Sequence, residues 1–149
     1  MLPYAIGPDE GKQVVMGIPE SGYFSHGRTH LLSENEKSSM TFEATMKLPN
    51  SILKNLQKLD YLKCDIEGYE NVAIPLFQDI IDHFRPIMQI EVASENIEFM
   101  MSYLSDKDFK AVEIKKGEVC QLLPGKTPEG DIIFIPQEKL SLLEEITKV

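Results

Sequence analysis

Three carboxylates lie within six residues of one another, and their side-chain types are suited to chemistry. Asp65 directly follows a compact apolar run, and Glu67 and Glu70 come next, on either side of Gly68. Because carboxylates this close repel one another, at least one pKa should rise, which would supply a general base or a magnesium site. The simpler interpretation is that Glu67 and Glu70 favour the amino end of the next helix. Spacing alone favours the simpler interpretation.

A pair of histidines, His26 and His30, forms the second candidate group. Two histidines four residues apart can share a metal ion when they lie on a helix. Gly27 and Thr29 favour a loop instead, and no carboxylate or cysteine completes a ligand set. We therefore predict no metal site and interpret these residues as surface polar groups, with contact to a substrate as the alternative. His83, late in a predicted helix, is assigned no chemistry.

The elements that position the carboxylates begin near residue 59, where apolar runs and helical periodicity start to alternate. Residues 59–64 are suited to a strand covered on both faces, so Asp65 falls at the carboxyl end of a strand, where ligands bind in open α/β sheets. The further expected elements are strands at 87–92 and 131–135, helices starting at Pro75 and Pro136, a helix over 94–104 capped by Ser94, and a hairpin of 109–115 and 119–123 around Lys116 and Gly117.

The part before residue 59 is less regular. Residues 11–17 and 40–46 are predicted to pair as a β-hairpin, residues 20–39 form a long loop, and Pro49 opens a short helix. The fold class is therefore α/β, with a mixed, open sheet that carries helices and is preceded by a β-hairpin and a long loop. We predict a single domain over residues 1–149.

Composition and charge limit the class of protein. The chain has 149 residues, of which 42% are hydrophobic and 26% charged, as in an ordinary globular domain. Its net charge of −9 argues against nucleic acid and bare membrane as partners. No apolar run approaches the roughly 20 residues that cross a bilayer, and the start lacks the features of a signal peptide. We expect a cytoplasmic protein whose two cysteines, Cys64 and Cys120, are reduced.

Residues 59–70 resemble the signature of the FkbM-type methyltransferase family. Leu-Asp-Tyr-Leu-Lys-Cys-Asp-Ile-Glu-Gly-Tyr-Glu contains the pattern Lys-x-Asp-x-Glu-Gly-x-Glu, with which a strand of that family's Rossmann-like sheet ends. Residues 85–91 and 131–136 resemble the next strand and the closing strand. Residues 5–11 and 40–53 resemble the segments after the third strand and before the fourth. The resemblance covers nearly the whole chain and implies the carboxyl-terminal part of the domain, with a partial Rossmann-like sheet.

The resemblance implies methylation of a hydroxyl group on a sugar or a small metabolite, with S-adenosylmethionine as the cofactor of the complete domain. Asp65 would lie beside the site of methyl transfer. Glu67 and Glu91 would position or deprotonate the acceptor hydroxyl, because carboxylates at adjacent strand ends suit that chemistry. Glu70 would orient its neighbours or cap the helix.

No two glycines of the chain are spaced as Gly-x-Gly, so no cradle for the cofactor is assigned and its binding residues are unknown. We expect that this chain alone neither binds S-adenosylmethionine nor catalyses the reaction. The alternative function is a non-catalytic binding or assembly module derived from the same fold. Without the family's first strand, residues 59–64 have an unpaired edge, which either the hairpin covers or a second copy pairs with. We expect a homodimer through that edge.

Overall fold

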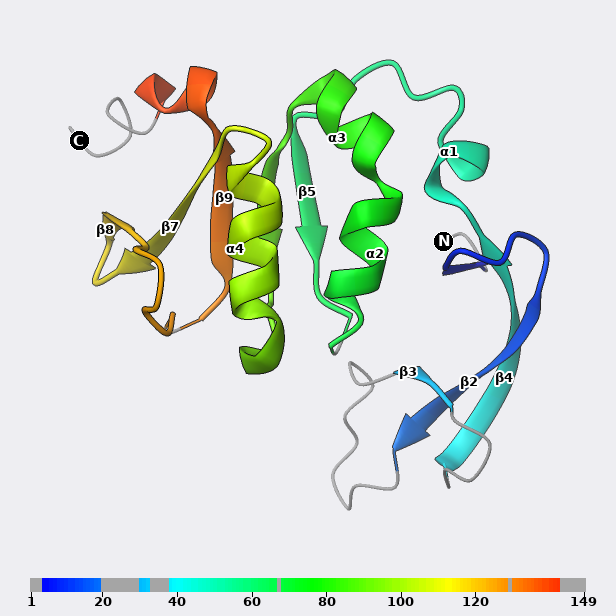
Figure 1. Ribbon diagram of the computed structural model, residues 1–149. Helices are drawn as coiled ribbons and strands as arrows, with labels where there is room; N and C mark the ends of the chain where they lie inside the picture. Colours follow the sequence, from blue (N-terminus) through cyan, green and yellow to red (C-terminus); the bar gives the residue numbers. More distant parts are fainter. Residues whose placement is uncertain (1–3, 20–29, 33–37, 67, 129, 143–149) are drawn as a thin grey trace.

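The computed structural model describes residues 4–19, 30–32, 38–66, 68–128 and 130–142, and these form two β-sheets with helices (Figure 1). The sheet of the amino-terminal part has the strand order β1-β4-β2-β3, and the second sheet has the order β5-β6-β9-β7-β8. The fold is α/β, as predicted. A single domain over residues 1–149 stays a prediction.

The predicted hairpin is formed by β2 (Gln13–Pro19) and β4 (Ser38–Lys47), which pair antiparallel. Two short strands that the sequence did not indicate enlarge it: β1 (Tyr4–Ile6) runs parallel to β4, and β3 (His30–Leu31) pairs with β2. β3 falls inside the predicted long loop, of which residues 20–29 and 33–37 lie outside the described residues. A strand of two residues has no periodicity to detect, so only its pairing reveals it.

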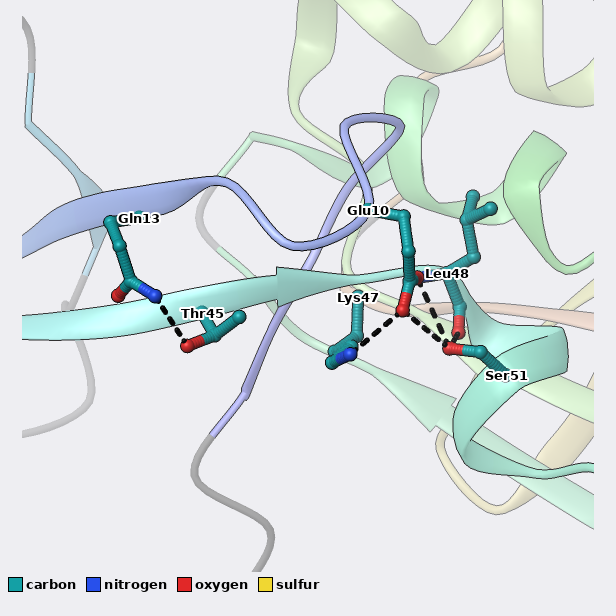
Figure 2. Close-up of polar contacts among 6 residues, drawn as sticks. All are labelled: Glu10, Gln13, Thr45, Lys47, Leu48 and Ser51. Atoms are coloured by element: carbon teal, nitrogen blue, oxygen red, sulfur yellow. Dashed lines mark hydrogen bonds and ion pairs between the residues drawn. The ribbon is translucent and has the colours of Figure 1, made fainter.

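Glu10 ties the turn after β1 to the end of β4 and to α1 (Pro49–Ile52), which starts at Pro49 as predicted (Figure 2). Its Oε1 atom lies 2.9 Å from Lys47 Nζ, and its Oε2 atom accepts the Leu48 N–H at 2.6 Å. The Ser51 hydroxyl donates to the same carboxylate. These donors lower the pKa of Glu10, the backbone N–H of Leu48 most of all. The amino-terminal sheet is thereby joined to the segment that leads into the second sheet.

The second sheet is mixed and open. β5 (Tyr61–Cys64) and β6 (Ile87–Ile90) are parallel, and β9 (Ile132–Pro136) runs antiparallel to β6. β7 (Phe109–Lys115) pairs with β9 and with β8 (Glu118–Gln121). In Figure 1 the helix α4 (Ile97–Ser105) lies in front of this sheet, and α2 (Glu70–Leu76) and α3 (Gln78–Phe84) lie beside β5. Their apolar side chains join those of the strands in one core: Cys64, Ile74, Ile81, Met88, Ile90, Met100, Leu104, Phe109, Ala111, Leu122, Ile132 and Phe134.

The prediction that residues 59–64 form a strand covered on both faces is wrong. Within the described chain β5 is an edge strand that pairs only with β6. Cys64 faces the core, but the Tyr61 side chain on the other face is 50% exposed, and Lys63 is exposed too. An apolar run indicates a strand, but it does not tell how many of its faces other elements cover.

The helix predicted to start at Pro75 starts earlier, at Glu70. Gly68, with a φ of 94°, allows the chain to turn directly after β5, so α2 begins at once. Pro75 lies in the last turn of α2, where its missing N–H weakens the helix before α3 begins at Gln78. Arg85, in the left-handed conformation, ends α3 as predicted.

The predicted cap of the next helix is also wrong. The Ser94 hydroxyl contacts Glu95, and the short 3-10 helix η1 (Ser94–Asn96) precedes α4 without a side-chain cap. The β7–β8 hairpin is confirmed, because Lys116 and Gly117 both have the positive φ of a tight hairpin turn.

At the carboxyl end, the 3-10 helix η2 (Gln137–Lys139) follows β9, and residues 143–149 of the predicted last helix lie outside the described residues. Cys64 is buried, Cys120 is half-buried, and neither forms a disulfide. In the described segments, no helix is both long and apolar enough to cross a membrane.

Candidate functional site

Asp65 and Glu91 are the first residues after β5 and β6, and the sheet brings them together. Parallel strands end at the same edge, and the register pairs Cys64 with Ile90, so the two carboxylates follow side by side. The Glu91 N–H donates to the Cys64 carbonyl at 3.0 Å, which joins the ends of the two strands. Two of the three predicted catalytic residues are therefore adjacent, while their catalytic roles stay a prediction.

Glu67, the third predicted catalytic residue, lies outside the described residues. So do His26, Gly27, Arg28 and Thr29 of the histidine segment. His30 is described through its backbone, which belongs to β3.

Lys63 is the cation of this site. Its Nζ atom lies 2.6 Å from Asp65 Oδ2. This hydrogen bond is the main cause that lowers the pKa of Asp65, and the hydrogen bond with Glu91 acts in the same direction. Asp65 in turn raises the pKa of Lys63, and the charges of Asp131 and Glu91 add to that effect. Both side chains of the ion pair are partly exposed, so solvent screens the interaction.

A row of polar side chains continues from this pair across the sheet. The Tyr61 hydroxyl donates to Gln89 Oε1, and Gln89 Nε2 donates to Asp131 Oδ2 at 2.5 Å. Because Lys63 and Gln89 are register partners, this row shares a face of the sheet with Lys63. This row was not expected from the sequence. Its detectable signal is a glutamine in the middle of an otherwise apolar strand.

Gly68 and Glu70 shape the turn that carries Asp65. Glu70 is fully buried, and its Oε1 atom accepts the N–H groups of Ile66 at 3.1 Å and Gly68 at 3.2 Å. Asn96 Nδ2, from the loop after β6, donates to the Gly68 carbonyl at 3.2 Å. The prediction that Glu70 orients its neighbours agrees with these contacts.

A cleft of about 1060 Å³ lies beside this turn. One wall comes from β5 and α2 and includes Leu62, Lys63 and Asp65; the other comes from the amino-terminal sheet and includes Ile6 and Met46. The strands of that sheet pair with one another and not with β5, so in the described part of the chain the hairpin faces the β5 edge without covering it. Most of the lining is apolar, with Lys63 and Asp65 as its charged groups.

The described residues contain neither a Gly-x-Gly turn nor a cluster of metal ligands. Gly68 is the glycine next to the carboxylates, and it lies in a turn with no second glycine two residues away. In these segments, no three histidine, cysteine or acidic side chains converge as metal ligands.

Comparison with known proteins identifies the family to which the residues of the site belong. The family model for the methyltransferase FkbM domain matches residues 1–111. The chain belongs to the FkbM methyltransferase family. The match contains Lys63, Asp65, Glu70 and Glu91, and it ends within β7, so Asp131 lies beyond it. No curated protein and no solved structure matches the chain. The resemblance of residues 59–70 to this family is therefore confirmed. Complete FkbM methyltransferase domains use S-adenosylmethionine as the cofactor.

Proposed function

We propose that this chain carries the acceptor side of an FkbM-type O-methyltransferase, which acts on a hydroxyl group of a sugar or a small metabolite. The observation that carries the proposal is the placement of Asp65 and Glu91 side by side at the ends of two parallel strands, with Lys63 paired to Asp65. Family membership supports methyl transfer as the reaction. The hydroxyl acceptor follows from the carboxylates, which are the groups that orient a hydroxyl and take its proton.

The two carboxylates suit different roles. A general base works best when its pKa lies near the operating pH. Lys63 and Glu91 lower the pKa of Asp65, so Asp65 holds a proton poorly and is suited to orient the hydroxyl as a hydrogen-bond acceptor. We assign the removal of the proton to Glu91, next to it. Glu67 keeps its predicted role of positioning the acceptor.

No residue of this chain is assigned to the methyl donor. The chain contains no Gly-x-Gly spacing, and Gly68 lies in a turn held by Glu70 and Asn96. The part of the reaction that these residues perform is to hold the acceptor, to orient its hydroxyl and to accept the proton.

The test is transfer of a labelled methyl group from S-adenosylmethionine by the full-length gene product to a panel of sugars and hydroxylated metabolites. We expect an O-methylated product whose formation depends on Asp65. Asp60→Ala is the matched control, because Asp60 lies before β5 and forms an exposed ion pair with Lys58, away from Glu91. Absence of transfer to every acceptor by a folded protein, or transfer that Asp65→Ala leaves unchanged, contradicts the proposal.

The second candidate function is a non-catalytic binding or assembly module. The missing glycine spacing is the observation that favours it. A folded full-length product that binds a hydroxylated ligand through Asp65 and Glu91, but transfers no methyl group, would support this candidate over the first.

A further inference from the structure

Glu70 is buried more deeply than a carboxylate at a helix start needs to be. Its side chain is 0% exposed, and its Oε2 atom has no hydrogen-bond partner among the described residues. Burial of a carboxylate with one unsatisfied oxygen is costly. An exposed glutamate would interact equally well with the amino end of α2. The contacts that Glu70 makes point instead to the turn before the helix, because Oε1 accepts the N–H groups of Ile66 and Gly68.

Asn96 holds the same turn from the opposite side. It belongs to η1, in the loop that follows Glu91, and its side chain donates to the Gly68 carbonyl. A backbone hydrogen bond from Glu91 N–H to the Cys64 carbonyl joins the two loops at their other end. Asp65 lies between these two connections. Its distance from Glu91 therefore depends on how Ile66 and Gly68 are held.

We propose that Glu70 and Asn96 are positioning residues that clamp the turn at Ile66 and Gly68 and so hold the Asp65 carboxylate beside Glu91. Neither residue contacts the acceptor; both act through the turn. The proposal rests on the proposed function for the use of the Asp65–Glu91 pair, while the clamp itself is a property of the two loops. It also explains why the acidic residue that ends the signature is buried.

The test is an NMR titration of the side-chain carboxyl carbons of Asp65 and Glu91 in the full chain. Two variants remove the clamp: Asn96→Ala deletes the donor to Gly68, and Glu70→Leu deletes the acceptor. Glu70→Gln is the conservative variant, because its amide oxygen can still accept both N–H groups. Asn50→Ala is the matched control, since Asn50 also donates one hydrogen bond between distant segments, at 2.7 Å to Asp79, away from the site.

We expect the lowered pKa of Asp65 to persist in the unmodified chain, in Glu70→Gln and in Asn50→Ala. In Asn96→Ala and Glu70→Leu the pKa of Asp65 should rise, because the displaced carboxylate loses its contact with Glu91. In the full-length gene product the same two variants should lower kcat by about tenfold to a hundredfold, as misplacement of a reacting group does, with little change in KM for the acceptor.

An unchanged pKa of Asp65 in a folded Asn96→Ala or Glu70→Leu chain overturns the proposal. If Glu70→Leu does not fold, Asn96→Ala decides alone, because its side chain is only half-buried. If the full-length product transfers no methyl group at all, the proposed function fails, and the titration still decides the clamp.

Discussion

Lys63 and Asp65 form an ion pair within one segment, with Lys63 Nζ 2.6 Å from Asp65 Oδ2. Residues two apart along a strand point to the same side, so the extended backbone of β5 already brings these side chains together. The Lys63 ammonium group is paired with Asp65, and the negative charges of Glu91 and Asp131 also act on it. The charge state of the site therefore depends on Lys63.

Replacement of Lys63 should change how Asp65 titrates. The pKa of Asp65 is lowered mainly by Lys63, so the effect of the pair is present above the ordinary aspartate value of 3.8 and is lost as the pH falls. In Lys63→Met the pKa of Asp65 should rise, and the acid limb of kcat/KM in the full-length product should move to higher pH. Lys58→Met is the control, because Lys58 pairs with Asp60 instead. If the acid limb of kcat/KM does not move in Lys63→Met, the ionisation of Asp65 does not control the reaction.

Asp65→Ala should abolish methyl transfer in the full-length product and leave the fold intact. Loss of a group that orients or deprotonates the acceptor costs about a hundredfold to ten-thousandfold in rate. Because Asp65 is partly exposed, its removal should change the circular dichroism spectrum and the Tm little. Asp60→Ala should keep full activity. A rate for Asp65→Ala within twofold of that of the unmodified protein would show that Asp65 does not contribute to methyl transfer.

The chain of 149 residues should not bind S-adenosylmethionine with useful affinity. Tight binding of this cofactor needs backbone N–H groups and a turn that approaches it closely, and no Gly-x-Gly spacing supplies that turn. Isothermal titration with the cofactor and with its demethylated product measures the affinity directly. A micromolar dissociation constant for either compound would show that other residues form the cradle.

We predict that the chain self-associates through β5. An edge strand with free N–H and C=O groups beside an apolar cleft is a template for pairing. Light scattering at micromolar concentration should give the mass of a dimer. Leu62→Lys, which places a charge in the cleft wall, should shift the equilibrium to monomer. Ile114→Lys, at an exposed position of β7, should not. A stable monomer of the unmodified chain contradicts this prediction.

The two thiols should differ in reactivity. Burial, with smaller contributions from the charges of Glu70 and Asp65, raises the pKa of Cys64 to about 12. Because the thiolate is the reactive form, Cys64 should resist alkylation at pH 8, while the half-buried Cys120 reacts faster. The neutral thiol also stabilises the fold below the ordinary value of 9.0, and this contribution is lost as the pH rises toward 12. Mass spectrometry after timed alkylation distinguishes the two cysteines, and equal rates in the folded chain would contradict the prediction.

Local features of the sequence were sufficient to predict several elements. The position of Asp65 at a strand end followed from an apolar run of a few residues, and the turn at Lys116 and Gly117 followed from the conformations that such a pair adopts. The strand around Val14 followed from a short apolar run between glycines and the strand around Ala44 from alternation. Each of these signals lies within about ten residues, so no knowledge of the packing was needed.

Only the tertiary structure decided which groups meet at the site. Gln89 bonds to Asp131, 42 residues away, because β9 inserts between β6 and the β7–β8 hairpin that precedes it in the chain. Glu70 is buried because α2 begins directly after the Gly68 turn. From the sequence, this helix was expected to start at Pro75, so Glu70 was not placed in it. β5 is an edge strand because, in the described part of the chain, it pairs only with β6. Strand order, burial and edge pairing are set by contacts between distant segments, and the residue types of one segment do not specify its partners.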